Sequence, residues 1–254
     1  MTEASYATRL FVEEDLAEGR SIGLDHARAH FLRSVLRLGR GAPVALFNGR
    51  DGEWRASVDG LGTGWASLQV ERRLKEQSAT PDLWLLFAPI KRARIDFLAE
   101  KATELGVSRL LPVTTRHTAV SRVNRERLAA NAREAAEQCE RLTVPDVAEP
   151  QRLFDLLGDW PSERRLLVCA EAGASRPLAE VLVEAAEGPR GPWALLVGPE
   201  GGFAESELDA LRKLPFVTAV GLGPRVLRSD TAALAALACW QAVLGDGRDG
   251  PPRD

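Results

Sequence analysis

Hydrophobic and polar positions follow two different patterns along the chain, and the change falls near residue 75. In residues 1–74, short apolar stretches are separated by glycine-containing turns such as Asn48-Gly49 and Asp51-Gly52. This pattern is typical of a small β-rich unit. Apolar positions on one face predict a single helix there, at residues 26–38. The expected strands of this region cover residues 22–24, 44–47, 54–58 and 65–70.

Beyond residue 81, apolar runs alternate with segments of helical period. The polar stretch 75–81 ends in proline and is the predicted linker. The expected strands cover residues 83–88, 110–113, 166–170, 193–197 and 217–222, and the expected helices cover 94–105, 125–142 and 231–244. Apolar strands that alternate with helices predict a parallel sheet covered on both faces. Residues 82–245 would form this second domain, and 246–254 a flexible tail.

Composition supports an ordinary folded protein. The chain has 254 residues, of which 45% are hydrophobic and 27% charged, enough for one or two domains with their own cores. No apolar stretch approaches the roughly 18–20 residues that span a bilayer, and acids occupy the amino-terminal segment, so we expect a cytoplasmic protein. The 3 cysteines lie far apart and the 3 histidines have no ligand spacing, which predicts neither disulfides nor a metal site.

Charge is distributed unevenly although the net charge is only −3. Residues 20–40 contain five arginines and one aspartate, and residues 91–127 contain nine basic and four acidic side chains. Residues 145–215 are acidic overall. Because phosphate contacts depend on local lysine and arginine, the two basic segments indicate a confined polyanion-binding surface. Solvation of helix faces by these arginines is the alternative.

Two glycine-containing loops follow strands of the expected parallel sheet. Gly198-Pro199-Glu200-Gly201-Gly202 comes after the strand 193–197, and residues 223–230 come after the strand 217–222. Ligands of open parallel sheets bind beyond the carboxyl ends of the strands, and glycine lets the backbone approach them closely. A tight turn without a ligand fits the first loop equally, and Ser229 or Asp230 can cap the following helix. Neither loop has a dinucleotide-binding or Walker pattern.

These loops carry a resemblance to a known family. The runs LLVGPEGGFAESEL (195–208) and LGPRVLRSDTA (222–232) resemble the knotted SPOUT methyltransferases, and among them the ribosomal RNA small subunit methyltransferase E family. Supporting matches occur in the same order within residues 30–41, 95–113 and 134–145. The chain departs from the family pattern at Ser229-Asp230, where Thr-Glu is usual, and at Cys139, where serine is usual. The acid and the hydroxyl keep their character.

The resemblance implies an α/β fold with two parts. One is an amino-terminal PUA-like β-barrel that binds RNA, and the other is a carboxy-terminal SPOUT α/β domain with a mainly parallel sheet and a deep trefoil knot. It also implies a homodimer that uses S-adenosylmethionine to methylate N3 of a uridine in 16S ribosomal RNA of the small ribosomal subunit. Two alternatives remain open at this point: a non-catalytic PUA-like RNA-binding assembly factor, and a SPOUT enzyme that acts on transfer RNA.

The resemblance also assigns site residues. The expected cofactor contacts are Leu196, Gly198, Pro199, Glu200, Gly201, Gly202, Leu222, Gly223, Val226 and Leu227. Uridine N3 is protonated at neutral pH, so the reaction needs a proton acceptor, for which Asp230 is the hypothesis, and cations that stabilise the anion. Those cations would be Arg228, Arg225 and Arg141. Glu200 and Glu171 could hold ribose hydroxyls or attract the sulfonium, and the alternative for both is a solvated loop acid. The expected RNA contacts are Arg9, Arg20, Arg33, Arg37, Lys91 and Arg92.

Overall fold

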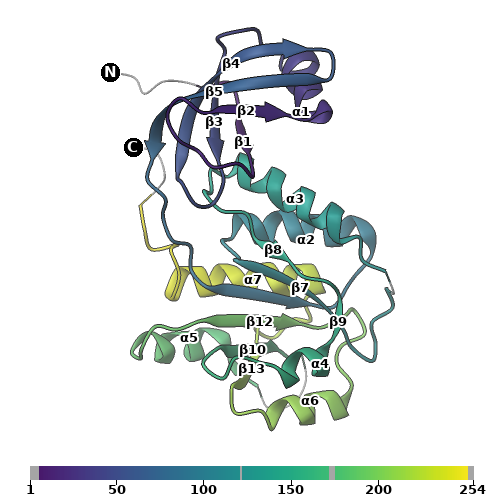
Figure 1. Cartoon of the computed structure of the whole chain (residues 1–254). Coiled ribbons are helices and arrows are strands. Elements are labelled where there is room, and N and C mark those ends of the chain that lie inside the picture. Colours follow the sequence, from purple (N-terminus) through teal and green to yellow (C-terminus); the bar gives the residue numbers. More distant parts are fainter. Residues whose placement is uncertain (1–5, 121, 172–174, 251–254) are drawn as a thin grey trace. The chain divides into compact units, whose positions relative to one another are not determined.

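The chain divides into two compact units in the computed structural model (Figure 1), which describes residues 6–120, 122–171 and 175–250, without the side chain of Arg92. One unit consists of Met1–Ala79 with Ala136–Val144, and the other of Thr80–Ala135 with Pro145–Asp254. The sequence pattern gave no sign that residues 136–144 belong with the amino-terminal unit.

The amino-terminal unit is built on a five-stranded sheet of order β1-β3-β4-β5-β2. Its strands are β1 (Arg9–Phe11), β2 (Ser21–Leu24), β3 (Pro43–Phe47), β4 (Glu53–Gly62) and β5 (Trp65–Lys75). β1 pairs with β3 in parallel, and the other neighbours are antiparallel. Helix α1 (His26–His30) continues into one π-helical turn, η1 (Phe31–Val35). Fully buried Leu32, Leu46 and Leu68 place the core between this helical segment and the sheet.

Backbone angles at two residues explain why the turn at Gly52 forms as predicted and why the predicted helix 26–38 is shorter in the structure. Gly52 has a φ of 84°, and a Cβ there would lie 2.2 Å from the carbonyl oxygen of Lys75, so only glycine fits the turn. The expected helix 26–38 ends earlier, at Val35, because Arg37 takes a left-handed φ of 55° that a helix cannot continue through.

The carboxy-terminal unit contains an eight-stranded sheet in which every pair is parallel. The order is β11-β13-β10-β12-β6-β7-β8, and β9 also pairs with β7. The strands are β6 (Leu83–Phe87), β7 (Arg109–Thr114), β8 (Asp146–Val147), β9 (Gln151–Arg152), β10 (Arg165–Cys169), β11 (Arg176–Pro177), β12 (Trp193–Val197) and β13 (Val217–Gly221). The sequence therefore predicted the five longer strands, and the two-residue strands are too short to produce a pattern.

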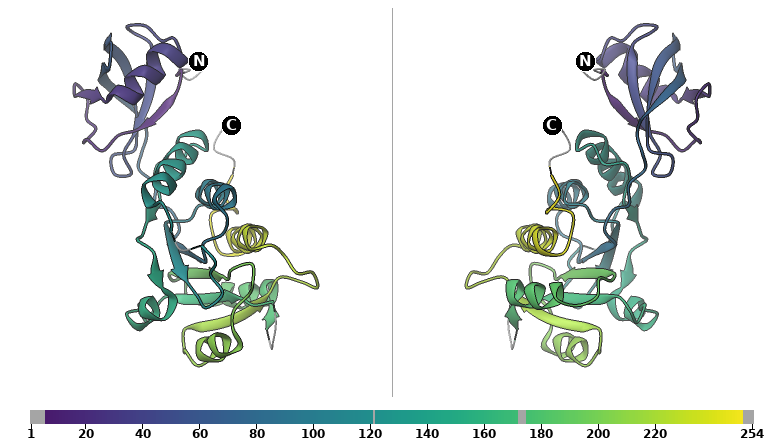
Figure 2. Two further views of the ribbon diagram at one scale, coloured as in Figure 1. Left: turned by 90° about the vertical axis from the view of Figure 1, so that its right-hand side faces the viewer. Right: turned by 90° about the vertical axis from the view of Figure 1, so that its left-hand side faces the viewer.

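Helices cover both faces of this sheet, as the alternating pattern predicted. The helices are α2 (Arg92–Glu104), α3 (Arg125–Gln138), α4 (Leu153–Gly158), α5 (Leu178–Ala186), α6 (Glu205–Arg212) and α7 (Ser229–Val243). Buried side chains of α2, α5 and α7 pack with one face, which includes Leu195 and Val197. Those of α4 and α6 pack with the opposite face, which includes Leu196 (Figure 2, with α7 in yellow and α6 in yellow-green).

Helix α3 is shorter than the expected helix 125–142, which is a correction. It ends at Gln138, and Glu140 takes a left-handed φ of 63°. Residues 136–144 then enter the amino-terminal unit, where the guanidinium of Arg9 donates hydrogen bonds to the backbone carbonyls of residues 136, 137 and 141. Arg9 is also paired with buried Glu53.

This arrangement overturns the prediction that Arg9 contacts RNA. The residue is 5% exposed, and its guanidinium nitrogens already have four protein partners. A phosphate cannot reach a charge that is buried in this way, so Arg9 stabilises the unit instead.

The carboxy-terminal end of the described chain is held in place. Gln241 on α7 donates a hydrogen bond to the carbonyl of Leu105 at the end of α2 and accepts one from the backbone N–H of Asp246. The predicted tail 246–254 therefore begins at an anchored residue, and its residues 251–254 lie outside the described part. Within the described ranges, no helix has both the length and the apolar character required for a membrane span.

Candidate functional site

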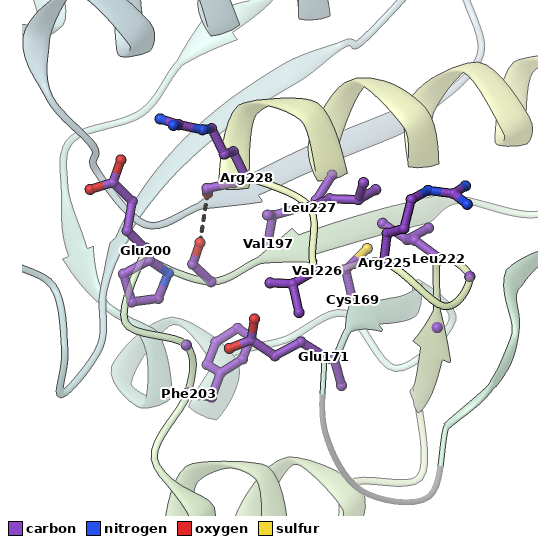
Figure 3. Close-up of a pocket in the computed structure, with 18 of the residues that line it drawn as sticks. Cys169, Glu171, Val197, Glu200, Phe203, Leu222, Arg225, Val226, Leu227 and Arg228 are labelled. Carbon is purple, nitrogen blue, oxygen red and sulfur yellow. Dashed lines mark hydrogen bonds between the residues drawn. The ribbon is translucent and has the colours of Figure 1, made fainter.

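A pocket opens where β6, β10, β12 and β13 end at the carboxyl edge of the parallel sheet (Figure 3). Its volume is about 690 Å³, within the ~300–1,000 Å³ that is usual for small-molecule sites. The sequence predicted this edge, and most of the predicted residues line the pocket. They are Lys91, Gly198, Pro199, Glu200, Gly202, Leu222, Gly223, Arg225, Val226, Leu227 and Arg228.

Four of the residues predicted to be catalytic or to bind the cofactor are not part of the pocket lining. Leu196 is fully buried in the middle of β12, between β10 and β6. Gly201 belongs to the loop but its carbonyl faces His117. Arg141 lies in the amino-terminal unit, where it donates a hydrogen bond to Thr143. Asp230 sits in the first turn of α7, and its carboxylate accepts a hydrogen bond from the backbone N–H of Thr231 at 3.0 Å.

The two glycine-containing loops are joined to each other. The buried hydroxyl of Ser229 donates a hydrogen bond of 2.7 Å to the carbonyl of Gly198, drawn as a dashed line in Figure 3. Ser229 is therefore not the N-cap of α7. Arg228 holds that position, and no side chain caps it. The prediction that the side chain of Ser229 or Asp230 caps the helix is therefore wrong. The Ser229 hydroxyl instead holds the loop that begins at Gly198.

Crowding at Gly198 and backbone conformation at Gly202 favour glycine in the first loop. A Cβ on Gly198 would lie 2.8 Å from the ring of Phe203, and one on Gly202 would lie 2.2 Å from a carboxylate oxygen of Glu171. Gly202 also has a φ of 67°, in the left-handed region. The loop backbone thus packs directly against two side chains that line the pocket.

The sequence pattern did not indicate several lining residues, among them Arg94, Phe203 and Cys169. Arg94, on α2, forms an ion pair of 3.1 Å with Glu200. Phe203 supplies an aromatic wall, and Cys169 ends β10 at the pocket centre (Figure 3). Desolvation raises the pKa of the Cys169 thiol to about 12, so it is a neutral, weakly polar wall at pH 7.

A second contact supports the first loop from the segment after β7. The imidazole Nδ1 of His117 lies 3.1 Å from the carbonyl of Gly201 and 3.2 Å from that of Gly202, so its N–H donates to this pair. Beside it, the buried carboxylate of Glu207 accepts hydrogen bonds from the backbone N–H groups of Arg116 and Ala204. His117 is exposed, and its contact with the two carbonyls holds the pocket loop.

Positive charge exceeds negative charge around the pocket. Its lining contains two acids, Glu171 and Glu200, and four basic residues, Lys91, Arg94, Arg225 and Arg228. Figure 3 shows Glu200 and Arg228 at one side and Arg225 at the other. Arg225 and Arg228 have no ion pair within the described residues. Together with apolar walls and the backbone groups of glycine loops, they suit an organic ligand next to an anionic one.

The other predicted RNA contacts can be placed individually. Arg20, Arg33 and Arg37 are exposed in the amino-terminal unit, and Lys91 is exposed at the pocket. The side chain of Arg92 lies outside the described residues. In residues 6–120, 122–171 and 175–250, no group of three or more His, Cys, Asp or Glu side chains could hold a metal ion.

Comparison with known proteins gives the class to which this fold and pocket belong. Residues 76–241 match the family model described as RNA methyltransferase domain. These residues include every strand of the parallel sheet and every residue that lines the pocket.

Individual relatives narrow the class. The ribosomal RNA small subunit methyltransferase E of Rickettsia conorii is 32% identical over 91% of this chain and 93% of its own length. That of Mycobacterium bovis is 31% identical over 84% and 86%. The crystal structure of the Neisseria gonorrhoeae enzyme of the same name, bound to S-adenosylmethionine, superimposes with a TM-score of 0.83 at 27% identity, over 94% and 98%. The chain belongs to the ribosomal RNA small subunit methyltransferase E family.

Proposed function

We propose that this protein transfers a methyl group from S-adenosylmethionine to N3 of one uridine in the 16S ribosomal RNA of the small ribosomal subunit. The observation that carries the proposal is the pocket at the carboxyl edge of the sheet, in a chain of this family. Its relative from Neisseria gonorrhoeae was solved with S-adenosylmethionine. Ribosomal RNA as substrate also favours a cytoplasmic location.

The pocket has the properties that S-adenosylmethionine requires. Its volume of about 690 Å³ accommodates a nucleoside with an amino acid side arm. Leu222, Val226 and Leu227 offer apolar surface for adenine, and the glycine loops expose backbone groups beside it. Glu171 is the acid that remains for ribose hydroxyls or the sulfonium, because Glu200 is already paired with Arg94.

The residues of the chain have separate tasks in the proposed reaction. When bound, S-adenosylmethionine supplies an electrophilic methyl group. Arg228 and Arg225 line the same pocket, and they stabilise the negative charge that spreads over the uracil ring when N3 loses its proton. Holding the two reactants in line supplies a large part of the acceleration. Arg141, which lies outside the pocket lining, is a further proposed cation.

Asp230 is the proposed proton acceptor. It is half-buried and adjacent to Ser229, which does line the pocket, and its carboxylate accepts only the N–H of Thr231 among the described hydrogen bonds. An Asp230→Asn variant keeps a hydrogen-bond acceptor at the helix start but cannot take a proton at neutral pH. We expect kcat to fall by about 100-fold or more while cofactor binding is retained. Undiminished turnover would remove Asp230 from the mechanism.

The remaining family features are part of the same proposal. We propose that residues 1–74 form a PUA-like barrel that binds RNA through Arg20, Arg33 and Arg37. Lys91, which lines the pocket, and Arg92, whose side chain lies outside the described residues, are further proposed RNA contacts. We further propose that the pocket loops belong to a trefoil knot in residues 82–245, and that the chain works as a homodimer. Support for the knot comes from the hydrogen bond between Ser229 and Gly198, which brings the chain after β13 against the loop after β12.

Methyl transfer to ribosomal RNA tests the proposal. The purified protein and labelled S-adenosylmethionine are incubated in three separate reactions. The first contains small ribosomal subunits that lack the modification, the second contains free 16S RNA, and the third contains transfer RNA. Nucleoside digestion and mass spectrometry then identify the product. We expect 3-methyluridine from the subunits. Methylated transfer RNA, or another methylated nucleoside, would refute the proposed specificity.

A further inference from the structure

One tryptophan of the amino-terminal unit presents an open ring to solvent. Trp65, at the start of β5, is 54% exposed, whereas the chain's other five tryptophans are half-buried or buried. An exposed indole gives up the free energy that burial would provide, so its position calls for a physical reason.

The indole of Trp65 is fixed from one side by the strand that precedes it. Gly60 and Gly62 lie two residues apart on β4, so they share a face of the sheet. A Cβ on Gly60 would lie 2.7 Å from the indole, and one on Gly62 would lie 2.2 Å from it. The ring therefore rests on backbone where two side chains are missing. Any other residue at these positions would displace it.

Basic side chains flank the same turn. Arg33, on η1, donates a hydrogen bond of 3.0 Å to the hydroxyl of Thr63, two residues before Trp65. The turn residue Gly64 faces the ring of His26, since a Cβ there would lie 2.8 Å from its Cδ2. We name Trp65, Thr63, Arg33 and His26 the Trp65 surface.

The charge of this region is positive and only partly neutralised locally. Residues 20–40 carry five arginines against Asp25, whose carboxylate accepts the backbone N–H of Arg28. Asp59, next to Gly60 on β4, is paired with Arg40 at 3.2 Å. Arg33 has only a neutral partner among the described contacts, the hydroxyl of Thr63. An oriented aromatic ring with a guanidinium beside it matches an unpaired nucleotide, which offers a π face and a phosphate.

We propose that Trp65 stacks on an unpaired base of the RNA substrate while Arg33 binds an adjacent phosphate. This inference rests on the proposed function for the identity of the RNA. It adds a second contact site, in the amino-terminal unit, for a nucleotide that is not the methylated one. Packing on Gly60 and Gly62 accounts for the covered face of the indole, and RNA stacking accounts for its open face.

The test compares RNA affinity between matched variants of the full chain. The probe is a short fluorescein-labelled single-stranded RNA, with the same RNA annealed to its complement as a second probe. Trp65→Leu keeps an apolar cover over the glycines but cannot stack. We expect it to bind the single strand about 5- to 100-fold more weakly, with its affinity for S-adenosylmethionine unchanged. The control is Phe154→Leu, which alters a 41% exposed aromatic residue of α4 in the other unit and should change neither affinity.

Arg33→Gln tests the phosphate contact independently of the ring. It should weaken binding to all RNA sequences alike and reduce the slope of log affinity against log salt by roughly 0.7–1. Arg40→Gln is the control, because Arg40 is exposed in the same unit and already paired with Asp59. An equal loss of slope in both variants would mean that Arg33 contributes only general positive charge, which overturns its assigned role.

Cross-linking distinguishes stacking from a folding defect. Irradiation of the wild-type complex with 5-bromouridine-substituted RNA should join the RNA to Trp65, identified by mass spectrometry.

If wild-type protein binds RNA and Trp65→Leu binds it equally well, the inference fails and the proposed function stands. If wild-type protein neither binds RNA nor methylates it, both fail. A change of oligomeric state in Trp65→Leu with unchanged RNA affinity would make the Trp65 surface a contact between copies and would also overturn the inference.

Discussion

Gly198→Ala is the substitution that probes the pocket most selectively. Gly198 has no left-handed backbone angle, so alanine meets no conformational penalty there. The new methyl group would lie 2.8, 3.1 and 3.1 Å from three carbon atoms of the Phe203 ring. Ordinary carbon contacts are about 3.5–4.0 Å, so the ring must shift by roughly 0.7 Å or more.

The magnitude follows from this crowding. Overpacking a tight site costs about 1–3 kcal/mol, and alanine recovers about 0.4–1 kcal/mol by restricting the unfolded chain. Phe203 lines the pocket, so its displacement also alters the cofactor site directly. We expect the Kd for S-adenosylmethionine to rise about 5- to 30-fold, which corresponds to about 1–2 kcal/mol, with a smaller loss of thermal stability.

Isothermal titration calorimetry with S-adenosylmethionine measures the effect without any need for turnover. The matched control is Gly158→Ala at the end of α4, where an added Cβ meets nothing within 4 Å. Combining Gly198→Ala with Phe203→Ala removes the clash. The effects of the two changes on the free energy of S-adenosylmethionine binding should therefore differ from additivity by about 1 kcal/mol or more. Wild-type affinity in Gly198→Ala, or strict additivity in the double variant, would refute the argument from packing.

Three further predictions follow from other contacts. Arg9→Met leaves the buried carboxylate of Glu53 with Lys75, at 3.6 Å, as its remaining ion pair, and should lower the unfolding temperature in calorimetry by roughly 4–12 °C, from about 2–3 kcal/mol of lost stability; a change below 2 °C would contradict the structural role. His117→Ala frees the glycine loop and should raise the Kd for S-adenosylmethionine about 3- to 10-fold, with little change in RNA affinity. Because burial raises the pKa of the Cys169 thiol to about 12, iodoacetamide should label exposed Cys239 far faster than Cys169 at pH 8, and the contribution of Cys169 to stability should be lost only as pH rises from 9 towards 12; equal labelling of the two thiols by mass spectrometry would contradict this.

The parallel sheet and its ligand edge could be predicted because they depend on strong local signals. Long apolar runs such as 193–197 determine strands. Gly198 follows directly after β12, and Gly223 comes two residues after β13. The carboxyl edge of a parallel sheet then brings these loops together whatever the details of side-chain packing.

The errors share a different cause, since each depends on contacts between distant segments. Arg9 was predicted to bind RNA because sequence alone cannot show that Glu53 and the carbonyls of residues 136–141 surround it. Arg94 was missed because it comes to the pocket from a helix and not from a strand end. The contact of His117 with the pocket loop could not be predicted for the same reason, because the carbonyls that it binds lie 84 and 85 residues further along the chain.

Reverse transcription can show directly whether the protein methylates one uridine of 16S ribosomal RNA. Small ribosomal subunits that lack the modification are incubated with the protein and isotopically labelled S-adenosylmethionine, and the RNA is then copied by reverse transcriptase. Because an N3 methyl group blocks base pairing, the account predicts label in the 16S RNA and a new strong stop at a single uridine. Binding of the cofactor without transfer of label to subunits, free ribosomal RNA or transfer RNA would contradict it.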